Sequence, residues 1–394
     1  MAEELRRVLG VGGATVVGLG AMIGTGVFAA WTPAVQLAGS ALLLALALAA
    51  VVAALNAVST ASLARVLPKS GGAYAYGRAY LSRPAGIVAG YSFVLGKSAS
   101  AGAAALTIGA YAWPGWERLV GLAAILVVLG LDLRGIVKSV RVTAVLVAFV
   151  IAVLGALVVT SSQEAFSPGA EALADPGGLG IVAAAGILFV AFAGYARITV
   201  LGEEVRDPAR TIPRAMVMSF AIVIVVYSVL AIVVLRAAAS GVVLSAAPLE
   251  GIAMAVGSDA LSALVRVGAV VAAGAVMLSL VAGIGRTLFA MGRGGDAPRA
   301  LDRVSPGTRV PARAEITAAL LAAAVVLVGG IGFALAVSAA FILTYYGVAH
   351  LAVLARVRRG DFPVVLGLTS GLGLAGCLAV VVGLAFGTGG LAAG

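Results

Sequence analysis

The chain of 394 residues is 62% hydrophobic and only 11% charged, whereas a soluble domain carries roughly 25% charged residues. A water-soluble fold of this length could not cover so much apolar surface, so the composition excludes an ordinary soluble protein and predicts a lipid environment. The formal net charge is +10. Because the basic residues lie in short loops between apolar runs, this charge indicates membrane orientation and not a nucleic-acid partner.

Apolar runs recur along the whole chain, and a membrane-spanning helix needs about 20 such residues. We therefore predict an all-α integral membrane protein with about eleven transmembrane helices. Their expected positions are 11–37, 39–65, 84–112, 117–133, 138–160, 179–205, 213–236, 259–292, 313–330, 332–356 and 362–387. The first of them lacks a cleavage-type end and is not expected to be a signal peptide.

The basic residues sort onto one side of these helices. With a cytosolic N-terminus, most of the 26 Lys and Arg residues fall in cytosolic loops. They are Arg6 and Arg7; Arg65, Lys69, Arg78 and Arg83; Arg134, Lys138 and Arg141; Arg206, Arg210 and Arg214; Arg286, Arg293, Arg299, Arg303, Arg309 and Arg313; and Arg356, Arg358 and Arg359. The positive-inside rule then predicts a multi-pass protein of the cell membrane with its N-terminus in the cytosol and its C-terminus outside.

The sequence of the first predicted helix favours an interruption within it. Four glycines, Gly18, Gly20, Gly24 and Gly26, follow one another in a short stretch, which is poor chemistry for a continuous helix. In lipid, a broken helix survives only where its freed backbone lines a cavity. The amides around Ile23, Gly24, Thr25 and Gly26 would then form an anion site suited to a carboxylate. The alternative is close helix packing on small residues.

The sixth predicted helix carries a second candidate break. Gly194 lies near its middle, and an interruption over Ala191, Phe192, Ala193 and Gly194 would free carbonyl oxygens to accept hydrogen bonds from an ammonium group. Phe192 and Tyr195 could flank that point as an apolar gate. The alternative reading is a packing glycine among packing aromatics.

The positions of the two breaks suggest an inverted repeat. If residues 1–160 hold one set of five helices and residues 179–356 a second set, helices one and six are equivalent, and 362–387 is an additional helix. Interrupted segments at corresponding positions of two halves are a sequence indication of a transporter binding site. The symmetry rests on helix count and glycine placement, because the halves share no clear residue-level identity.

Three stretches resemble the amino acid–polyamine–organocation superfamily of permeases, which have the LeuT-type fold. They are the glycine-rich run from Gly18 to Phe28, the loop from Leu67 to Tyr76, and Phe192-Ala193-Gly194-Tyr195 together with Gly202 to Ala215; Arg286 to Arg293 is a weaker match. The resemblance implies a substrate pocket between helices one, three, six, eight and ten. It also implies that the substrate carboxylate meets the amides of Gly24, Thr25 and Gly26, and that its ammonium meets carbonyls around Ala191 to Ala193. Many relatives have twelve spans, so the expected eleven are a departure outside the core repeats.

Lys97 and Arg197 are basic residues inside predicted spans. A lysine near the centre of helix three should face a cavity or lose its proton, and we interpret Lys97 as a proton-coupling residue or a cationic substitute for a sodium ion. The alternative is a lysine that extends toward the interface. Arg197 is expected to form a gating or structural ion pair with Glu203 or Glu204. Sodium coupling is less favoured.

Several chemistries find no support in the sequence. One cysteine, Cys377, and one histidine, His350, allow no metal cluster, and no phosphate-binding loop is present, so we expect no metal, no cofactor and no enzyme activity. His350 is interpreted as an interfacial helix-end residue. The acidic residues fall in loops or at helix ends, which argues against a dicationic substrate.

The predicted function is a proton-coupled secondary transporter of an amino acid or related amine that works by alternating access. An exchanger and, less favoured, a channel are the alternatives; the oligomeric state stays open.

Overall fold

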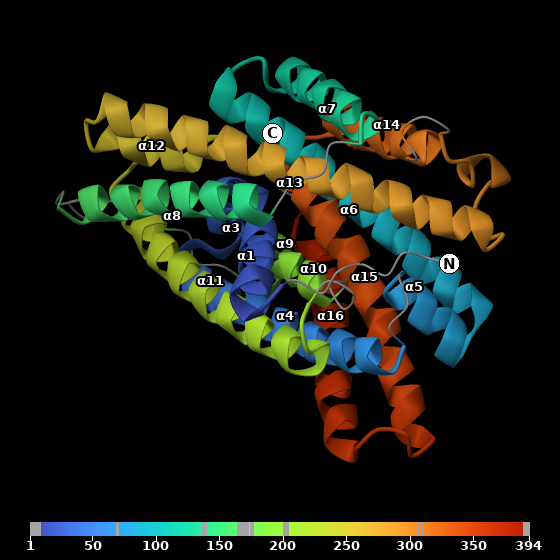
Figure 1. Ribbon diagram of the computed structural model, residues 1–394. Helices are drawn as coiled ribbons and strands as arrows, with labels where there is room; N and C mark the ends of the chain where they lie inside the picture. Colours follow the sequence, from blue (N-terminus) through green and yellow to red (C-terminus); the bar gives the residue numbers. More distant parts are fainter. Residues whose placement is uncertain are drawn as a thin grey trace.

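The computed structural model describes residues 9–67, 71–135, 140–163, 173, 177–199, 205–305, 308 and 310–388. Within these ranges the regular elements are helices, apart from one isolated parallel bridge between Leu9 and Val205. The helices form a bundle in which α1, α9 and α10 lie at the centre (Figure 1). In chain order the α-helices are α1 (Val11–Met22), α2 (Thr25–Ala29), α3 (Trp31–Ala38), α4 (Leu42–Val66), α5 (Ala73–Tyr76), α6 (Arg83–Ala112), α7 (Glu117–Leu133), α8 (Val140–Gln163), α9 (Gly178–Phe192), α10 (Ala196–Thr199), α11 (Pro208–Ala239), α12 (Pro248–Ala255), α13 (Asp259–Arg293), α14 (Ala312–Val328), α15 (Ile331–Arg358) and α16 (Val364–Gly387).

The all-helical membrane architecture expected from the sequence is confirmed. In the described part of the chain, nine helical segments are long and apolar enough to cross a membrane. The remaining two predicted spans form α7 and α14, which have 17 residues each and are shorter than the roughly 20 residues a spanning helix needs. The count of eleven crossings therefore stays a prediction.

Local chemistry explains where several helices begin. The Ser82 hydroxyl accepts a hydrogen bond from the Ala85 amide at the start of α6, and the Ser258 hydroxyl accepts one from the Leu261 amide at the start of α13. These are the N-cap bonds that satisfy otherwise unpaired amides. Pro208 begins α11, where its missing N–H costs nothing.

Besides the 3₁₀ turn Arg299–Leu301, two short elements were not predicted from the sequence. One is α5 with the π-helical turn Gly77–Leu81 that follows it. The other is α12, which lies between α11 and α13. Gly71 and Gly72 precede α5 with φ angles of +116° and +54°, a backbone region that favours glycine. Both elements are too short for hydrophobic periodicity to reveal them.

His350 corrects one expectation. It is fully buried and not interfacial. Its Nδ1 lies 2.9 Å from Ser59 Oγ and its Nε2 lies 2.7 Å from Asn56 Oδ1, both on α4. Ser370 and Cys377 of α16 complete this polar cluster, at 2.9 Å from Ser59 Oγ and 3.3 Å from Asn56 Oδ1 respectively. The cluster thus joins α4, α15 and α16 through side chains that apolar surroundings cannot satisfy.

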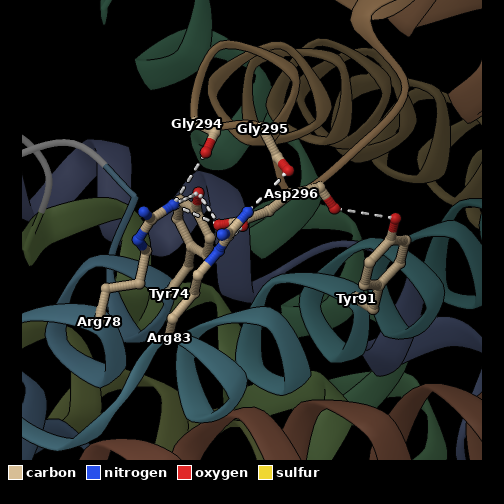
Figure 2. Close-up of polar contacts among 7 residues, drawn as sticks. All are labelled: Tyr74, Arg78, Arg83, Tyr91, Gly294, Gly295 and Asp296. Carbon is tan, nitrogen blue, oxygen red and sulfur yellow. Dashed lines mark hydrogen bonds and ion pairs between the residues drawn. The ribbon is translucent and has the colours of Figure 1, made fainter.

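A second polar cluster joins α5, α6 and the segment after α13, and Figure 2 shows its residues converging on Asp296. We name it the Asp296 cluster; it comprises Tyr74, Arg78, Arg83 and Asp296. The Tyr74 hydroxyl donates to Asp296 Oδ2 at 2.8 Å, and Arg83 Nε donates to Oδ1 at 2.8 Å. Arg78 forms an ion pair with the same carboxylate. The Asp296 side chain is fully buried beneath these donors, whereas those of Arg78 and Arg83 are 34% and 60% exposed.

The Asp296 cluster also fixes the backbone after α13. Arg83 Nη2 donates to the Gly295 carbonyl at 3.0 Å, and the Tyr91 hydroxyl donates to the Asp296 carbonyl at 3.1 Å. Burial alone would raise the pKa of the Asp296 carboxyl, but the hydrogen bonds from Arg83 and Tyr74 and the charges of Arg78 and Arg83 lower that pKa below its ordinary value. The carboxylate is therefore ionised at neutral pH and stabilises the fold in that form.

We expect Asp296→Asn to lower the free energy of unfolding by about 1–3 kcal/mol at neutral pH, because it leaves two arginines without their counter-charge. Since the folded-state pKa of Asp296 is lowered, its stabilising effect is complete above the ordinary pKa of about 4 and is lost as the pH falls below that value. Thermal unfolding in detergent, followed from pH 7 to pH 3, should show the difference between wild type and variant shrinking at the acid end. A difference that is the same at both ends would contradict this account.

Candidate functional site

The predicted interruption of the first helix is present. α1 ends at Met22, and Ile23 (φ −82°, ψ 75°) and Gly24 (φ −143°, ψ −134°) leave the helical conformation before α2 begins at Thr25. The Gly24 amide donates to the Met22 carbonyl at 3.0 Å in a tight turn. After Ala30, hydrogen bonds from the Ala30 amide to Gly26 and from the Ala34 amide to Ala30 carry the helix on into α3.

The interruption of the sixth predicted helix is also present, in a tighter form than expected. α9 ends at Phe192, a 3₁₀ turn covers Ala193–Tyr195, and α10 follows over Ala196–Thr199. The helix tightens into a 3₁₀ turn here and does not unwind, since the Ala193 amide still donates to the carbonyls of Phe189 and Val190. This turn leaves fewer carbonyl oxygens without a hydrogen-bond donor than a fully extended interruption would leave.

The two breaks contact each other directly through glycine. A Cβ placed on Gly26 would lie 2.5 Å from the Cα of Ala191, so α2 and α9 touch backbone to backbone. A Cβ on Gly194 would overlap the backbone of Ala21 at the end of α1, and one on Gly24 would overlap Val276 on α13. Only glycine permits approaches this close. The structure therefore brings together the residues that the sequence placed in two separate helices.

Most of the predicted site is shielded from the surface. Ile23, Gly24, Thr25 and Gly26 are buried, as are Ala191, Phe192, Ala193 and Tyr195, while Gly194 is partly buried. The Thr25 hydroxyl is buried and makes no hydrogen bond with the described residues. Buried polar groups normally have a partner, so the first break contains a buried hydroxyl whose hydrogen-bonding capacity is unused among the described residues.

Tyr227 on α11 joins the two breaks and is not among the residues predicted from the sequence. Its hydroxyl lies 2.6 Å from the Met22 carbonyl and 3.3 Å from the Ala191 carbonyl. One hydroxyl is therefore hydrogen-bonded to a carbonyl oxygen of each interrupted helix. A single tyrosine in a long apolar run gives no sequence pattern that distinguishes it. Which neighbours it faces depends on how α11 packs on α1.

Aromatic rings surround the second break. Phe192 stacks on Phe220 with ring centroids 6.3 Å apart and meets Tyr227 edge-on at 5.2 Å. Tyr195 stacks on Tyr346 of α15 at 5.6 Å. The predicted gate residues Phe192 and Tyr195 thus form part of a larger aromatic group that α11 and α15 complete.

At the α12 end of the site a third set of contacts encloses α2. The Tyr111 hydroxyl at the end of α6 donates to the Phe28 carbonyl at 2.9 Å and accepts from the Leu249 amide of α12 at 3.3 Å. Arg266 on α13 donates to the carbonyl oxygens of Tyr111 and Ala112, both at 2.9 Å. Its guanidinium also lies 3.6 Å from the Glu250 carboxylate of α12. This end of the site is closed by hydrogen bonds, whereas aromatic rings cover the second break.

The predicted ionisable residues are only partly placed. Lys97 is partly buried on α6, and Arg197 is partly buried on α10. Glu203 and Glu204, the predicted partners of Arg197, lie outside the described residues. In the described residues no three His, Cys, Asp or Glu side chains gather closely enough to hold a metal ion.

Comparison with known proteins agrees with this architecture. Residues 13–357 match the amino acid permease family. The chain belongs to that family. This permease is 43% identical to an uncharacterized transporter of Mycobacterium tuberculosis, over 97% of its own length and 87% of the relative's. It is 26% identical to the branched-chain amino acid permease BcaP of Bacillus subtilis, over 78% of this chain and 72% of that one. It is 28% identical to the vacuolar cationic amino acid transporter 4 of Arabidopsis thaliana, over 82% and 58%.

Family membership settles the coarse function and confirms the resemblance found in the sequence. The permease is a multi-pass membrane protein and an amino acid transporter, not a member of an enzyme family. The matched range begins within α1 and ends within α15, so it contains both breaks and Tyr227.

We expect Gly26→Ala to disrupt this permease, because the new methyl group would collide with the Ala191 backbone and backbone cannot rotate away. Overpacking of this kind costs about 1–3 kcal/mol, so both the thermal stability and the transport rate should fall. The matched control is Gly283→Ala on α13, where a Cβ would meet nothing within 4 Å. Equal behaviour of the two variants would show that the close contact between α2 and α9 is unimportant.

Tyr227→Phe tests the bond between the two breaks. The variant keeps the ring but removes the hydroxyl's hydrogen bonds to the Met22 and Ala191 carbonyls, while the Gly24 amide still donates to Met22. The free energy of unfolding should fall by about 0.5–1.5 kcal/mol, the usual net contribution of a hydrogen bond. Tyr80→Phe is the matched control, since the Tyr80 hydroxyl makes no hydrogen bond in the described part of the chain. Thermal unfolding of the ligand-free proteins compares the two, and a loss no larger than that of Tyr80→Phe would argue against the bridging role.

Proposed function

We propose that this permease is a secondary active transporter that moves an amino acid or a related amine across the cell membrane by alternating access. The observation that carries the proposal is the direct contact between two interrupted helices, Gly26 against Ala191 and Gly194 against Ala21. Interrupted helices expose amide and carbonyl groups at the middle of a membrane protein, and those groups suit the two charged ends of an amino acid.

The substrate carboxylate would bind at the first break. Gly24, Thr25 and Gly26 stand at the start of a helical segment, where amide groups and the helix dipole favour an anion. The Thr25 hydroxyl, buried without a partner in the described residues, would add a further donor. Ile23 lies at the turn itself and would set the direction in which these donors point.

The substrate ammonium would bind the carbonyl oxygens near Ala191, Phe192 and Ala193. The Ala191 and Met22 carbonyls accept hydrogen bonds from Tyr227, so an ammonium group bound here would replace or share the Tyr227 hydrogen bonds. Tyr195 and Phe192 would cover the site as a gate, and Arg197 would form an ion pair with Glu203 or Glu204 beside it.

The two five-helix repeats, 1–160 and 179–356, would supply the moving parts, with α16 outside them. Lys97 would carry the coupling proton, with sodium coupling less favoured. The N-terminus would lie in the cytosol and the C-terminus outside, as the basic loops indicate. An exchanger built on the same site is the second candidate, because exchange requires the same two breaks and differs only in whether the empty carrier reorients.

Uptake into liposomes that contain the purified permease tests the proposal. We expect saturable accumulation of an α-amino acid driven by an inward proton gradient, and its collapse when a proton ionophore is added. Accumulation that needs an amino acid inside the liposomes and ignores the ionophore would favour exchange. Conductive flux without saturation would contradict a transporter mechanism.

Lys97→Ala tests the coupling residue separately. If Lys97 carries the proton, the variant should keep downhill amino acid flux but lose at least about tenfold of the stimulation by the proton gradient, equivalent to about 1.4 kcal/mol of coupling. The measurement compares initial uptake rates with and without the gradient. Unchanged stimulation would exclude Lys97 as the coupling group.

A further inference from the structure

A cavity of about 400 Å³ lies between the last turn of α6 and the first half of α13. Tyr111 and Ala112 line it from α6, and Arg266 lines it from α13. The other lining residues of α13 are apolar and recur every third or fourth position: Ala263, Val267, Val270 and Val271. We name these four residues the apolar stripe. Residues at this spacing share one side of a helix, so the stripe extends over about 12 Å at roughly 1.5 Å per residue. Ala263 and Val267 are exposed, so the cavity opens onto the surface of the bundle.

Two tryptophans place this cavity near the boundary between lipid and water. Trp113 follows Ala112 directly, and the Trp116 amide donates to the Trp113 carbonyl at 3.1 Å in the turn between α6 and α7. Both tryptophans are exposed, and tryptophans of membrane proteins are enriched at the level of the lipid headgroups. α13 begins at Asp259 and leads away from this end of the bundle. The apolar stripe therefore runs from the headgroup level toward the hydrocarbon.

Arg266 is the charged residue among those that line the cavity in the described structure. Its Nε and Nη2 donate to the carbonyl oxygens of Tyr111 and Ala112, both at 2.9 Å. These bonds take two of the five N–H groups of a guanidinium, so the group can also donate to an acceptor in the cavity. The Glu250 carboxylate lies 3.6 Å from Arg266 Nε, but the Glu250 side chain is 12% exposed and that of Arg266 is 42% exposed. A ligand that enters from the membrane thus meets the cation and not the acid.

We propose that this cavity binds a phospholipid, with a phosphate oxygen on the Arg266 guanidinium and an acyl chain along the apolar stripe. Guanidinium groups form short, charge-assisted hydrogen bonds with phosphates. The phosphate supplies the preference, because any acyl chain of the surrounding lipid would fit the stripe, whereas an anionic group also satisfies the cation. A free phosphate ion would use Arg266 but leave the stripe unoccupied. The inference does not depend on which substrate the permease carries.

The position of this site connects the lipid with the first break. Arg266 holds two carbonyls at the end of α6, and the Tyr111 hydroxyl in turn donates to the Phe28 carbonyl of α2 at 2.9 Å. A phosphate bound to Arg266 would therefore act on the residues that hold α2 in place. Because a ligand that binds only the folded protein stabilises it by mass action, the phospholipid should also raise the melting temperature.

The test compares two lipids that differ in the phosphate headgroup. The purified full-length protein is freed of lipid in detergent and titrated with dioleoyl phosphatidylglycerol or with dioleoylglycerol, and bound lipid is counted by native mass spectrometry. We expect the first phosphatidylglycerol to bind at least about tenfold more tightly than dioleoylglycerol, a difference of about 1.4 kcal/mol. The melting temperature should rise with phosphatidylglycerol alone. Equal affinities for the two lipids would overturn the inference.

Variants assign the bound lipid to this cavity. Ala263→Phe fills the cavity without removing Arg266 and should weaken binding of the first phosphatidylglycerol at least about tenfold. Ala156→Phe makes the same change at an exposed position of α8 and should leave that affinity unchanged. Arg266→Gln should reduce the affinity for phosphatidylglycerol to that for dioleoylglycerol, and Arg266→Lys should recover part of the difference. An affinity that survives Ala263→Phe would overturn the assignment, whether or not the Arg266 variants fold.

Inorganic phosphate distinguishes a lipid from a free ion. Millimolar phosphate should neither displace bound phosphatidylglycerol nor raise the melting temperature as far as the lipid does, because the ion makes no contact with the apolar stripe. If phosphate alone reproduces the stabilisation and displaces the lipid, Arg266 binds an inorganic anion and the inference is wrong.

Discussion

The contact between Gly26 and Ala191 determines how the centre of this permease is arranged. Where α2 and α9 touch backbone to backbone, no side chain can separate them, and the neighbouring pair Gly194 and Ala21 repeats the same contact from the other side. Membrane helices gain little from burying apolar groups against each other, since lipid is equally apolar, so close packing on small residues is what holds them together. Here the packing residues are also the residues at which the helices break.

This coincidence explains why the interruptions are tolerated. Each break releases backbone groups that lipid could not satisfy, and each is covered by the other break, by Tyr227 or by the aromatic group around Phe192 and Tyr195. The Tyr227 hydroxyl binds carbonyls of both breaks and so satisfies backbone groups of each. At the two ends of the bundle, Arg266 and the Asp296 cluster join α6 to α13 and to the segment after it by ion pairs and by hydrogen bonds to backbone carbonyls.

The sequence predicted the helices well and the side-chain partners poorly. Each of the eleven expected segments contains a helix in the described part of the chain, apart from the two breaks and a few residues at segment ends, because apolar length and loop charge are properties of a single segment. Both breaks were placed within a residue or two, since glycine spacing is equally local. Tyr227, Tyr111 and Asp296 were missed because their roles depend on which residues of other helices lie opposite them. His350 was misplaced for the same reason: its position near a basic helix end suggested the interface, whereas packing of α4 and α16 around it buries it. The pairing of Arg197 with Glu203 or Glu204 lies outside the described residues and stays a prediction.

The polar cluster around His350 shows that the last helix, α16, is part of the polar packing of the core. Read as a sequence, α16 is an addition to a ten-helix core, and its outward face is apolar and exposed. Its inward face, however, supplies Ser370 and Cys377 to the hydrogen bonds of Asn56, Ser59 and His350, and Gly373 lies directly against the imidazole ring. Without α16, an amide, a hydroxyl and an imidazole of the core would face hydrocarbon. The helix thus shields polar side chains of α4 and α15 from the lipid. A chain shortened before α16 would need detergent or another protein to shield them.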